Sequence, residues 1–386
     1  MDIFIRTRQN NARNIHEKSF INFFLNTAFM GLLQKRQLTP FFLNQYHPIM
    51  MTFSTRSSPN HFRQGITAGI IAGALWGLVF LFPRLTPEFS PMSQMVLRYM
   101  CYGLFAFVLS FRTLPALMRT LSSHDWGMLV KLSLQANILY YLCLATGVKY
   151  GGIAPTTLII GMLPVTIAVM GRNDAGSLSW RALYAPIGLI VGGIIFISWD
   201  LFSHTSETLT STPIQRLFAL LSATGALVLW TYAAVNNARY LRERPDLSPA
   251  DWSNLTGVVT ALLSIGILII AYLIAQWQPD HIFAINTQAD LPWLKFILLG
   301  GVVIAFLSSY VGNILWNKAS QLLPISLSGQ LIMSETLFSL LYGFIYDGRM
   351  PRLLEWVAMV LALSGVLWAI KLHAEAHPKD APPEMH

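Results

Sequence analysis

Long apolar runs without charged residues follow one another along most of the chain. Of its 386 residues, 54% are hydrophobic and only 11% are charged, whereas about 25% of the residues of an ordinary soluble domain are charged. An α-helix needs roughly 20 apolar residues to cross the hydrocarbon core of a bilayer. Because most of the runs reach that length, the chain is expected to be an all-α polytopic membrane protein.

The runs predict ten transmembrane helices joined by short connections. None of the connections is long enough to hold a separate soluble domain. The expected spans are residues 66–82, 92–110, 126–146, 151–170, 182–201, 214–237, 252–277, 293–315, 322–345 and 353–371.

Both ends of the chain lie outside these spans. Residues 1–64 form a basic leader that is expected to be disordered, and residues 373–386 are expected to form a cytoplasmic tail. Met50 and Met51 stand just before the first convincing helix. Translation from Met1 and translation from near these two methionines, with the leader left untranslated, are both open.

The basic residues mark topology rather than a nucleic-acid surface. The formal charge is +8, and outside the basic leader most of the Lys and Arg lie near the ends of the apolar runs, which is typical of membrane proteins. With the leader left aside, one set of ends carries ten Lys and Arg and the other carries four. Since cytoplasmic loops are richer in Lys and Arg, both termini are expected on the cytoplasmic side of an inner (plasma) membrane. The lipid bilayer is an expected partner, and nucleic acid is not.

The chain contains an internal repeat of five helices, expected at 65–201 and 214–372. Residues 158–171 align with residues 331–343 when one gap is allowed. Gly-Ala-Leu occurs in both the first and the sixth span, followed soon by a tryptophan. Because five is an odd number, the second copy enters the membrane from the opposite side. Inverted repeats of this kind place the substrate site of secondary transporters near the midplane, between the halves.

Two stretches carry a resemblance to a known family. They are ILYYLCLATGVKYGGIAPTTLIIGMLPVTIAVMG from Ile138 and NILWNKASQLLPISLSGQLIMSETLFSLLYG from Asn313. Together with the order of ten spans in two halves, they resemble the EamA-type members of the drug/metabolite transporter (DMT) superfamily over nearly all of residues 65–372. The resemblance implies efflux of small organic metabolites, such as amino acids or drug-like compounds. The chain departs from the family in that Pro164 lacks a preceding Glu, and Glu335 is followed by Thr336.

One carboxylate, Glu335, lies near the middle of the apolar stretch 322–346. An ionisable side chain at membrane depth costs roughly 2.5–3.5 kcal/mol on insertion scales, so it usually faces a protein-lined or watery interior. Glu335 is therefore expected to accept a proton or to pair with a substrate amine. The alternative is that a protonated or hydrogen-bonded Glu335 only fastens its helix to a neighbour.

Other polar and aromatic residues lie inside the spans at helical spacing. Asn137 and Tyr141 are four residues apart and share a helix face, whereas Gln330 and Glu335 are five apart. If these faces converge, they form a cavity that suits an organic solute with an apolar part and an amine or amide. Alternatively, the amides are hydrogen-bonding contacts between helices and the aromatic rings are packing. The candidate substrate-binding residues are Trp76, Asn137, Tyr141, Trp230, Asn313, Gln330 and Glu335.

Arg98 lies little more than one turn into the second span. Its long side chain is expected to snorkel to the outer membrane surface rather than to line a binding site.

Enzyme motifs do not occur in the sequence. It contains neither His-Glu-x-x-His nor a Gly-rich phosphate loop, so neither an enzyme nor a cofactor or metal site is expected. The expected function is a secondary transporter that works by alternating access, with a proton as candidate coupling ion. A receptor or an assembly scaffold is the alternative from another class, and a monomer and a homodimer are both open.

Overall fold

The computed structural model describes residues 59–170, 180–203, 211–244, 246–279, 281–322 and 325–376. The chain divides into two units, Met1–Ser57 and Ser58–His386, and all described residues belong to the second. Most of the expected leader, with Met50 and Met51, lies outside the described residues, as do Gly171 and the end of the expected tail.

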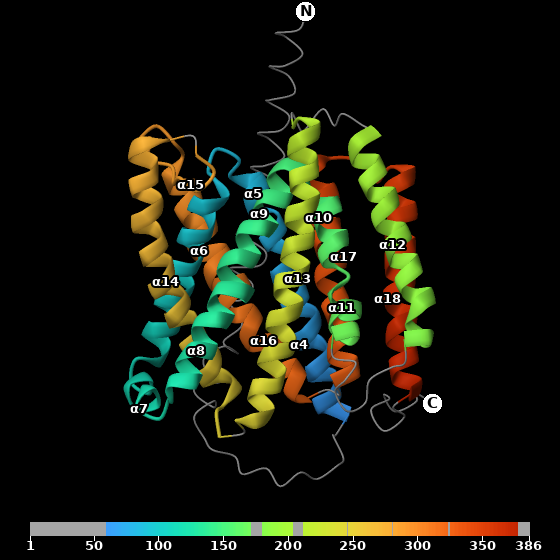
Figure 1. Ribbon diagram of the computed structural model, residues 1–386. Helices are drawn as coiled ribbons and strands as arrows, with labels where there is room; N and C mark the ends of the chain where they lie inside the picture. The colour runs from blue at the N-terminus through green and yellow to red at the C-terminus, as the bar shows by residue number, and fades with distance from the viewer. Residues whose placement is uncertain are drawn as a thin grey trace, which may run out of the picture. The chain divides into compact units, whose positions relative to one another are not determined.

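The described residues are helical, with turns and short loops between the helices (Figure 1). The helices are α4 (Pro59–Gly77), η3 (Leu78–Phe80), α5 (Phe82–Leu85), α6 (Pro91–Ser110), α7 (Leu114–Met118), α8 (Ser123–Leu132), η4 (Ser133–Leu139), α9 (Tyr140–Gly151), α10 (Ile153–Ile160), α11 (Leu163–Met170), α12 (Trp180–Ser203), α13 (Pro213–Glu243), α14 (Pro249–Trp277), α15 (Trp293–Ile297), η6 (Leu298–Val311), α16 (Gly312–Leu322), α17 (Ile325–Asp347) and α18 (Leu353–Ala376).

Helical backbone covers most of every expected span where the chain is described, with breaks at Leu81, Gly152 and residues 161–162. Several ends lie beyond the expected spans; for example, α4 begins already at Pro59, α13 continues to Glu243, and α18 continues to Ala376 in the expected tail. Proline is favourable at the first helical position because its missing N–H would have no partner there. Among the described residues, seven helical segments are long and apolar enough to cross a membrane, and residues 153–167 and 353–365 form shorter apolar helices. The fold is therefore an all-α membrane fold, while the count of ten crossings stays a prediction.

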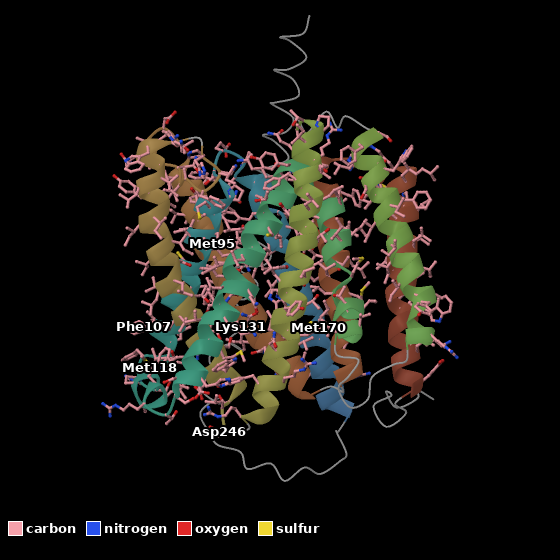
Figure 2. All side chains as sticks on the ribbon, in the orientation of Figure 1. Met95, Phe107, Met118, Lys131, Met170 and Asp246 are labelled. Carbon is pink, nitrogen blue, oxygen red and sulfur yellow. The ribbon has the colours of Figure 1, made fainter. Side chains whose placement is uncertain are left out.

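The outward faces of the helices are apolar. Phe107 is 50% exposed and points outward from α6 (Figure 2), and Ile269 of α14 is 58% exposed. A soluble monomer rarely exposes large continuous apolar patches. An apolar surface of this kind is suited to contact with lipid chains. Helices are suited to the same environment because their backbone groups are hydrogen-bonded within the helix.

Local sequence signals set the starts of several helices. The Ser90 hydroxyl accepts a hydrogen bond of 3.1 Å from the backbone N–H of Ser93 at the start of α6. Ser122 and Asp125 form a reciprocal capping box at the start of α8. Thr212 and Gln215 form another at the start of α13. Such caps satisfy backbone N–H groups that have no partner within the helix.

The helices of the two halves pack against each other in pairs. In Figure 1, α12 and α18 lie side by side, and α6 packs along α14 in the same way. In addition, α4 packs against α16 and α17, and α13 packs against α9, α10 and α11. The most intimate contacts therefore join the first half to the second, so the space between the halves is where a shared site can form.

Glycine allows α6 and α14 to approach closely. A Cβ added to Gly103 of α6 would lie 2.6 Å from the backbone oxygen of Gly257, and one added to Gly257 would lie 2.9 Å from the Cβ of Ala106. Small residues let membrane helices pack with their backbones near each other. Residues of both α6 and α14 line the cavity described in the next section.

Two long helices contain π-helical turns. The segment η4 separates α8 from α9, and η6 separates α15 from α16. π-Turns are rare and often mark functional sites, because they leave the regular hydrogen-bond ladder locally disturbed. Both segments contribute residues to the same cavity.

Candidate binding cavity

A cavity of about 420 Å³ lies between helices of both halves. Its size falls within the range of about 300–1,000 Å³ that is typical of small-molecule sites. Its wall includes residues from α4, α6, α8, η4, α9 and α11 in the first half, and from α13, α14, η6, α16 and α17 in the second. A small organic molecule is therefore the size of ligand that it could hold.

Two aromatic pairs form much of the wall. Trp76 of α4 lies against Trp316 of α16, with ring centroids 5.2 Å apart. Tyr140 of α9 lies near Trp230 of α13, with centroids 6.5 Å apart. Rings of this kind offer large apolar surfaces and can also attract a cation.

Three asparagine side chains, Asn137, Asn237 and Asn313, contribute to the polar part of the wall. The Asn137 Nδ2 donates a hydrogen bond of 2.9 Å to the Thr260 hydroxyl, and the Asn313 Nδ2 donates one of 3.5 Å to the Tyr102 hydroxyl. Each of these two amides therefore joins two helices and lines the cavity as well. The two alternatives for these residues, interhelical contact and ligand contact, are compatible in this geometry.

Glu335 of α17 lines the cavity. Its carboxylate makes no hydrogen bond or ion pair with the residues that the structure describes. The close approach of α17 to α4 holds it in place, since a Cβ on Gly73 would lie 2.8 Å from the backbone nitrogen of Glu335. The carboxylate is thus positioned by backbone packing and left available to a proton or a solute.

Arg98 of α6 is the second charged group of the cavity wall. Its Nε donates a hydrogen bond of 3.0 Å to the Ser309 hydroxyl of η6, and its guanidinium lies over the rings of Tyr141, at 4.7 Å, and Tyr99, at 5.0 Å. Arg98 is only 7% exposed, so the expectation that it snorkels to the membrane surface is wrong. The rings of Tyr99 and Tyr141 and the Ser309 hydroxyl take the place of the water that would otherwise surround the guanidinium at the membrane surface.

The seven candidate residues from the sequence fall into three groups. Five of them line this one cavity, namely Trp76, Asn137, Trp230, Asn313 and Glu335. Tyr141 is fully buried and is not part of the lining, but its ring contacts the guanidinium of Arg98. The side chain of Gln330 lies outside the described residues.

Sequence reasoning missed several lining residues, including Arg98, Tyr99, Tyr102, Tyr140, Trp252 and Trp316. A signal for two of them was present. The order Asn-Ile-Leu followed by an aromatic residue occurs at 137–140 and again at 313–316, and in both places the Asn and the aromatic residue line the cavity.

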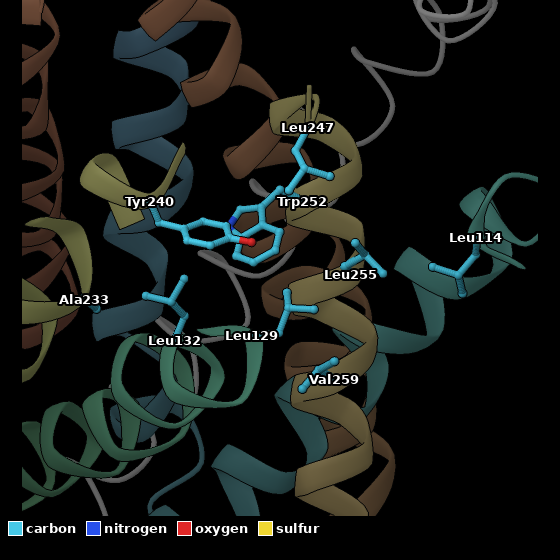
Figure 3. Close-up of a cluster of buried hydrophobic side chains, with 9 residues drawn as sticks. All are labelled: Leu114, Leu129, Leu132, Ala233, Tyr240, Leu247, Trp252, Leu255 and Val259. Carbon is cyan, nitrogen blue, oxygen red and sulfur yellow. The ribbon is translucent and has the colours of Figure 1, made fainter. Parts of the chain in front are cut away.

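A buried cluster adjoins the cavity, and Figure 3 shows its side chains. Leu132, Ala233 and Trp252 belong both to this cluster and to the cavity wall. Within it the ring of Tyr240 stacks on that of Trp252, with centroids 4.7 Å apart. The Tyr240 hydroxyl donates a hydrogen bond to Asp125. This cluster ties the start of α8 to the end of α13 beside the cavity.

Replacing Asp125 with Asn is expected to lower the free energy of unfolding by about 1.5–3 kcal/mol, the usual worth of a hydrogen bond to a charged group. Asp125 is buried, and its Oδ1 lies 2.5 Å from Nη1 of Arg244. Thermal unfolding of the purified protein in detergent measures the effect. Asp246→Asn is the control, because the 60% exposed Asp246 side chain also pairs with Arg244 and should change the free energy by less than about 0.5 kcal/mol. Equal shifts for the two variants would contradict the assignment.

Comparison with known proteins supports the fold and identifies a relative. No family model matches the chain. A crystal structure described only as that of a protein has 16% identity and a TM-score of 0.51, and the match covers 82% of this chain and 99% of the other. At that identity the likeness concerns the fold alone. The inner membrane protein YtfF of Escherichia coli (strain K12) is 34% identical over 317 residues, which cover 81% of this chain and 96% of YtfF. The chain therefore belongs to the same protein family as YtfF.

Proposed function

We propose that the protein is a secondary transporter of the inner (plasma) membrane that exports small organic solutes by alternating access, with both termini in the cytoplasm. The observation that carries this proposal is the cavity between the two halves, which contains the carboxylate of Glu335 without a partner among the described residues. The YtfF relative, an inner membrane protein, and the resemblance to EamA-type members of the DMT superfamily support the location and the class.

The proposed architecture is two inverted repeats of five helices. Its support is the pairing of the helices. If the halves are repeats, α4 corresponds to α13, α6 to α14, α9 to α16, and α12 to α18. The contact of α4 with α16 then corresponds to the contact of α13 with α9, and both contacts exist. The same correspondence leaves the pairs α6–α14 and α12–α18 unchanged. A pseudo-twofold axis between the halves predicts this pattern.

Side chains around the cavity show the same correspondence between the two halves. Asn137 and Tyr140 on one side match Asn313 and Trp316 on the other. The ring pair of Tyr140 with Trp230 matches the pair of Trp316 with Trp76. A site built from matched elements can be approached from either membrane face by similar movements, which is what alternating access requires.

In this proposal Glu335 couples the solute to the proton gradient. Its carboxylate can accept a proton or pair with the cationic amine of a solute. It can therefore carry a proton in one direction and pair with a substrate amine in the other. No Gly-rich phosphate loop occurs in the sequence, so an ion gradient is the energy source that fits this chain alone.

Flux measurements in vesicles test the proposal. Purified protein is reconstituted, and the movement of labelled amino acids is followed under an imposed pH gradient. Faster flux than in protein-free vesicles, lost when a protonophore collapses the gradient, is the expected result. Absence of flux for every solute, in protein that is correctly inserted, would favour the receptor or scaffold alternative.

A further inference from the structure

Arg98 is a buried cation whose hydrogen bonding is incomplete. Its Nε is hydrogen-bonded to Ser309, but its Nη1 is buried and has no hydrogen-bond partner among the described residues. A buried donor left without a partner costs about 1–3 kcal/mol, and more when it is charged. The faces of Tyr99 and Tyr141 offset part of that cost, but they do not accept the N–H in the plane of the guanidinium. The arrangement is therefore incomplete without a further acceptor.

The cavity lies beside Arg98, which is part of its lining. Arg98 and Glu335 are the two charged side chains in the lining of the cavity within the described residues. The two side chains do not form an ion pair with each other. The cavity thus presents one cationic group and one anionic group, each free to meet an opposite charge on a ligand.

Taking the proposed transport function as its basis, we propose that Arg98 binds the carboxylate of the solute and Glu335 binds its amine, so that the cavity takes zwitterions with an apolar or aromatic body. A guanidinium offers a planar set of donors that matches a carboxylate. The tryptophan and tyrosine rings of the wall accommodate the body of the solute. A dianion such as phosphate fits poorly, because it would add two negative charges near Glu335 and leave the aromatic surfaces uncovered.

Binding measurements on the intact protein test this assignment. Trp76, Trp230, Trp252 and Trp316 line the cavity, so intrinsic fluorescence of the protein in nanodiscs reports on occupancy. The probes are phenylalanine, phenylalaninamide, which lacks the carboxylate, and phenylpropionate, which lacks the amine. The wild type is expected to bind phenylalanine at least about 10-fold more tightly than either analogue, since 1.4 kcal/mol corresponds to a factor of ten.

Two substitutions separate recognition from folding. Arg98→Gln should remove the preference for phenylalanine over phenylalaninamide, and Arg98→Lys should keep part of it because the charge remains. Arg112→Gln is the matched control, since Arg112 is exposed and should leave the preference unchanged. Equal binding of the three probes to the wild type, binding of none of them, or an unchanged preference in Arg98→Gln would each overturn the assignment.

Flux of labelled phenylalanine into vesicles distinguishes this inference from the proposed function. The expected binding preference without any flux would contradict transport and leave the role of Arg98 standing. Flux that favours phenylalaninamide over phenylalanine in the wild type would support transport and contradict the role of Arg98.

Discussion

Replacement of Glu335 with Gln is expected to abolish pH-dependent transport while the protein still inserts into the membrane. Gln has nearly the same size and can still form hydrogen bonds, but it neither accepts a proton nor carries a negative charge. Since Arg98 is the other charged group of the cavity wall, no other carboxylate described there could replace Glu335. Flux in vesicles at several imposed pH gradients measures the effect, and we expect a loss of at least about tenfold.

A matched control shows whether the effect belongs to the cavity. Glu88→Gln removes an exposed carboxylate between α5 and α6 and should leave flux and its pH dependence unchanged. If Glu335→Gln retains pH-sensitive transport at the wild-type rate, Glu335 is only a structural contact between helices, and the coupling mechanism fails.

Replacement of Gly103 with Leu is expected to prevent α6 from packing against α14. A Cβ at this position would lie 2.2 Å from the Cβ of Ala261 and 2.6 Å from the backbone oxygen of Gly257. The backbone of α14 cannot rotate away as a side chain can, so the helices must separate. Overpacking of this kind usually costs about 1–3 kcal/mol and sometimes more, and the cavity wall beside Tyr102 would move with α6.

The control for this substitution lies on α14. Gly266→Leu adds the same side chain where nothing lies within 4 Å of the new Cβ, so it should be tolerated. The yield of monodisperse protein and its thermal unfolding in detergent compare the two variants. Normal yield and unchanged unfolding of Gly103→Leu would show that the crossing of α6 and α14 is not as close as described.

The sequence predicts the helical class and the position of the helices well. The bilayer imposes a length and an apolar surface on every crossing, and the apolar runs record both. The ends are harder to place, as α4 and α18 show, because a helix can continue beyond the lipid wherever its caps and propensities allow.

The candidate site was partly predictable. Trp76, Asn137 and Glu335 are unusual at membrane depth, which marks them in the sequence, and the structure places all three on one cavity. Arg98 was misjudged because its position near a helix end suggests an easy route to water. Its actual environment depends on Tyr141 and Ser309, which come from other helices, and no pattern within one span shows such contacts.

Alternating access requires the cavity between the halves to open to each membrane face in turn. Ala234→Cys, in a protein whose Cys101 and Cys143 have been replaced, places a thiol on the cavity wall, and Leu262→Cys places one on the outward apolar surface, where Leu262 is 62% exposed. A membrane-impermeant thiol reagent is added to right-side-out and to inside-out vesicles. We expect Ala234→Cys to be labelled from both sides and Leu262→Cys from neither. Labelling of Ala234→Cys from one side only, or from neither, would contradict alternating access.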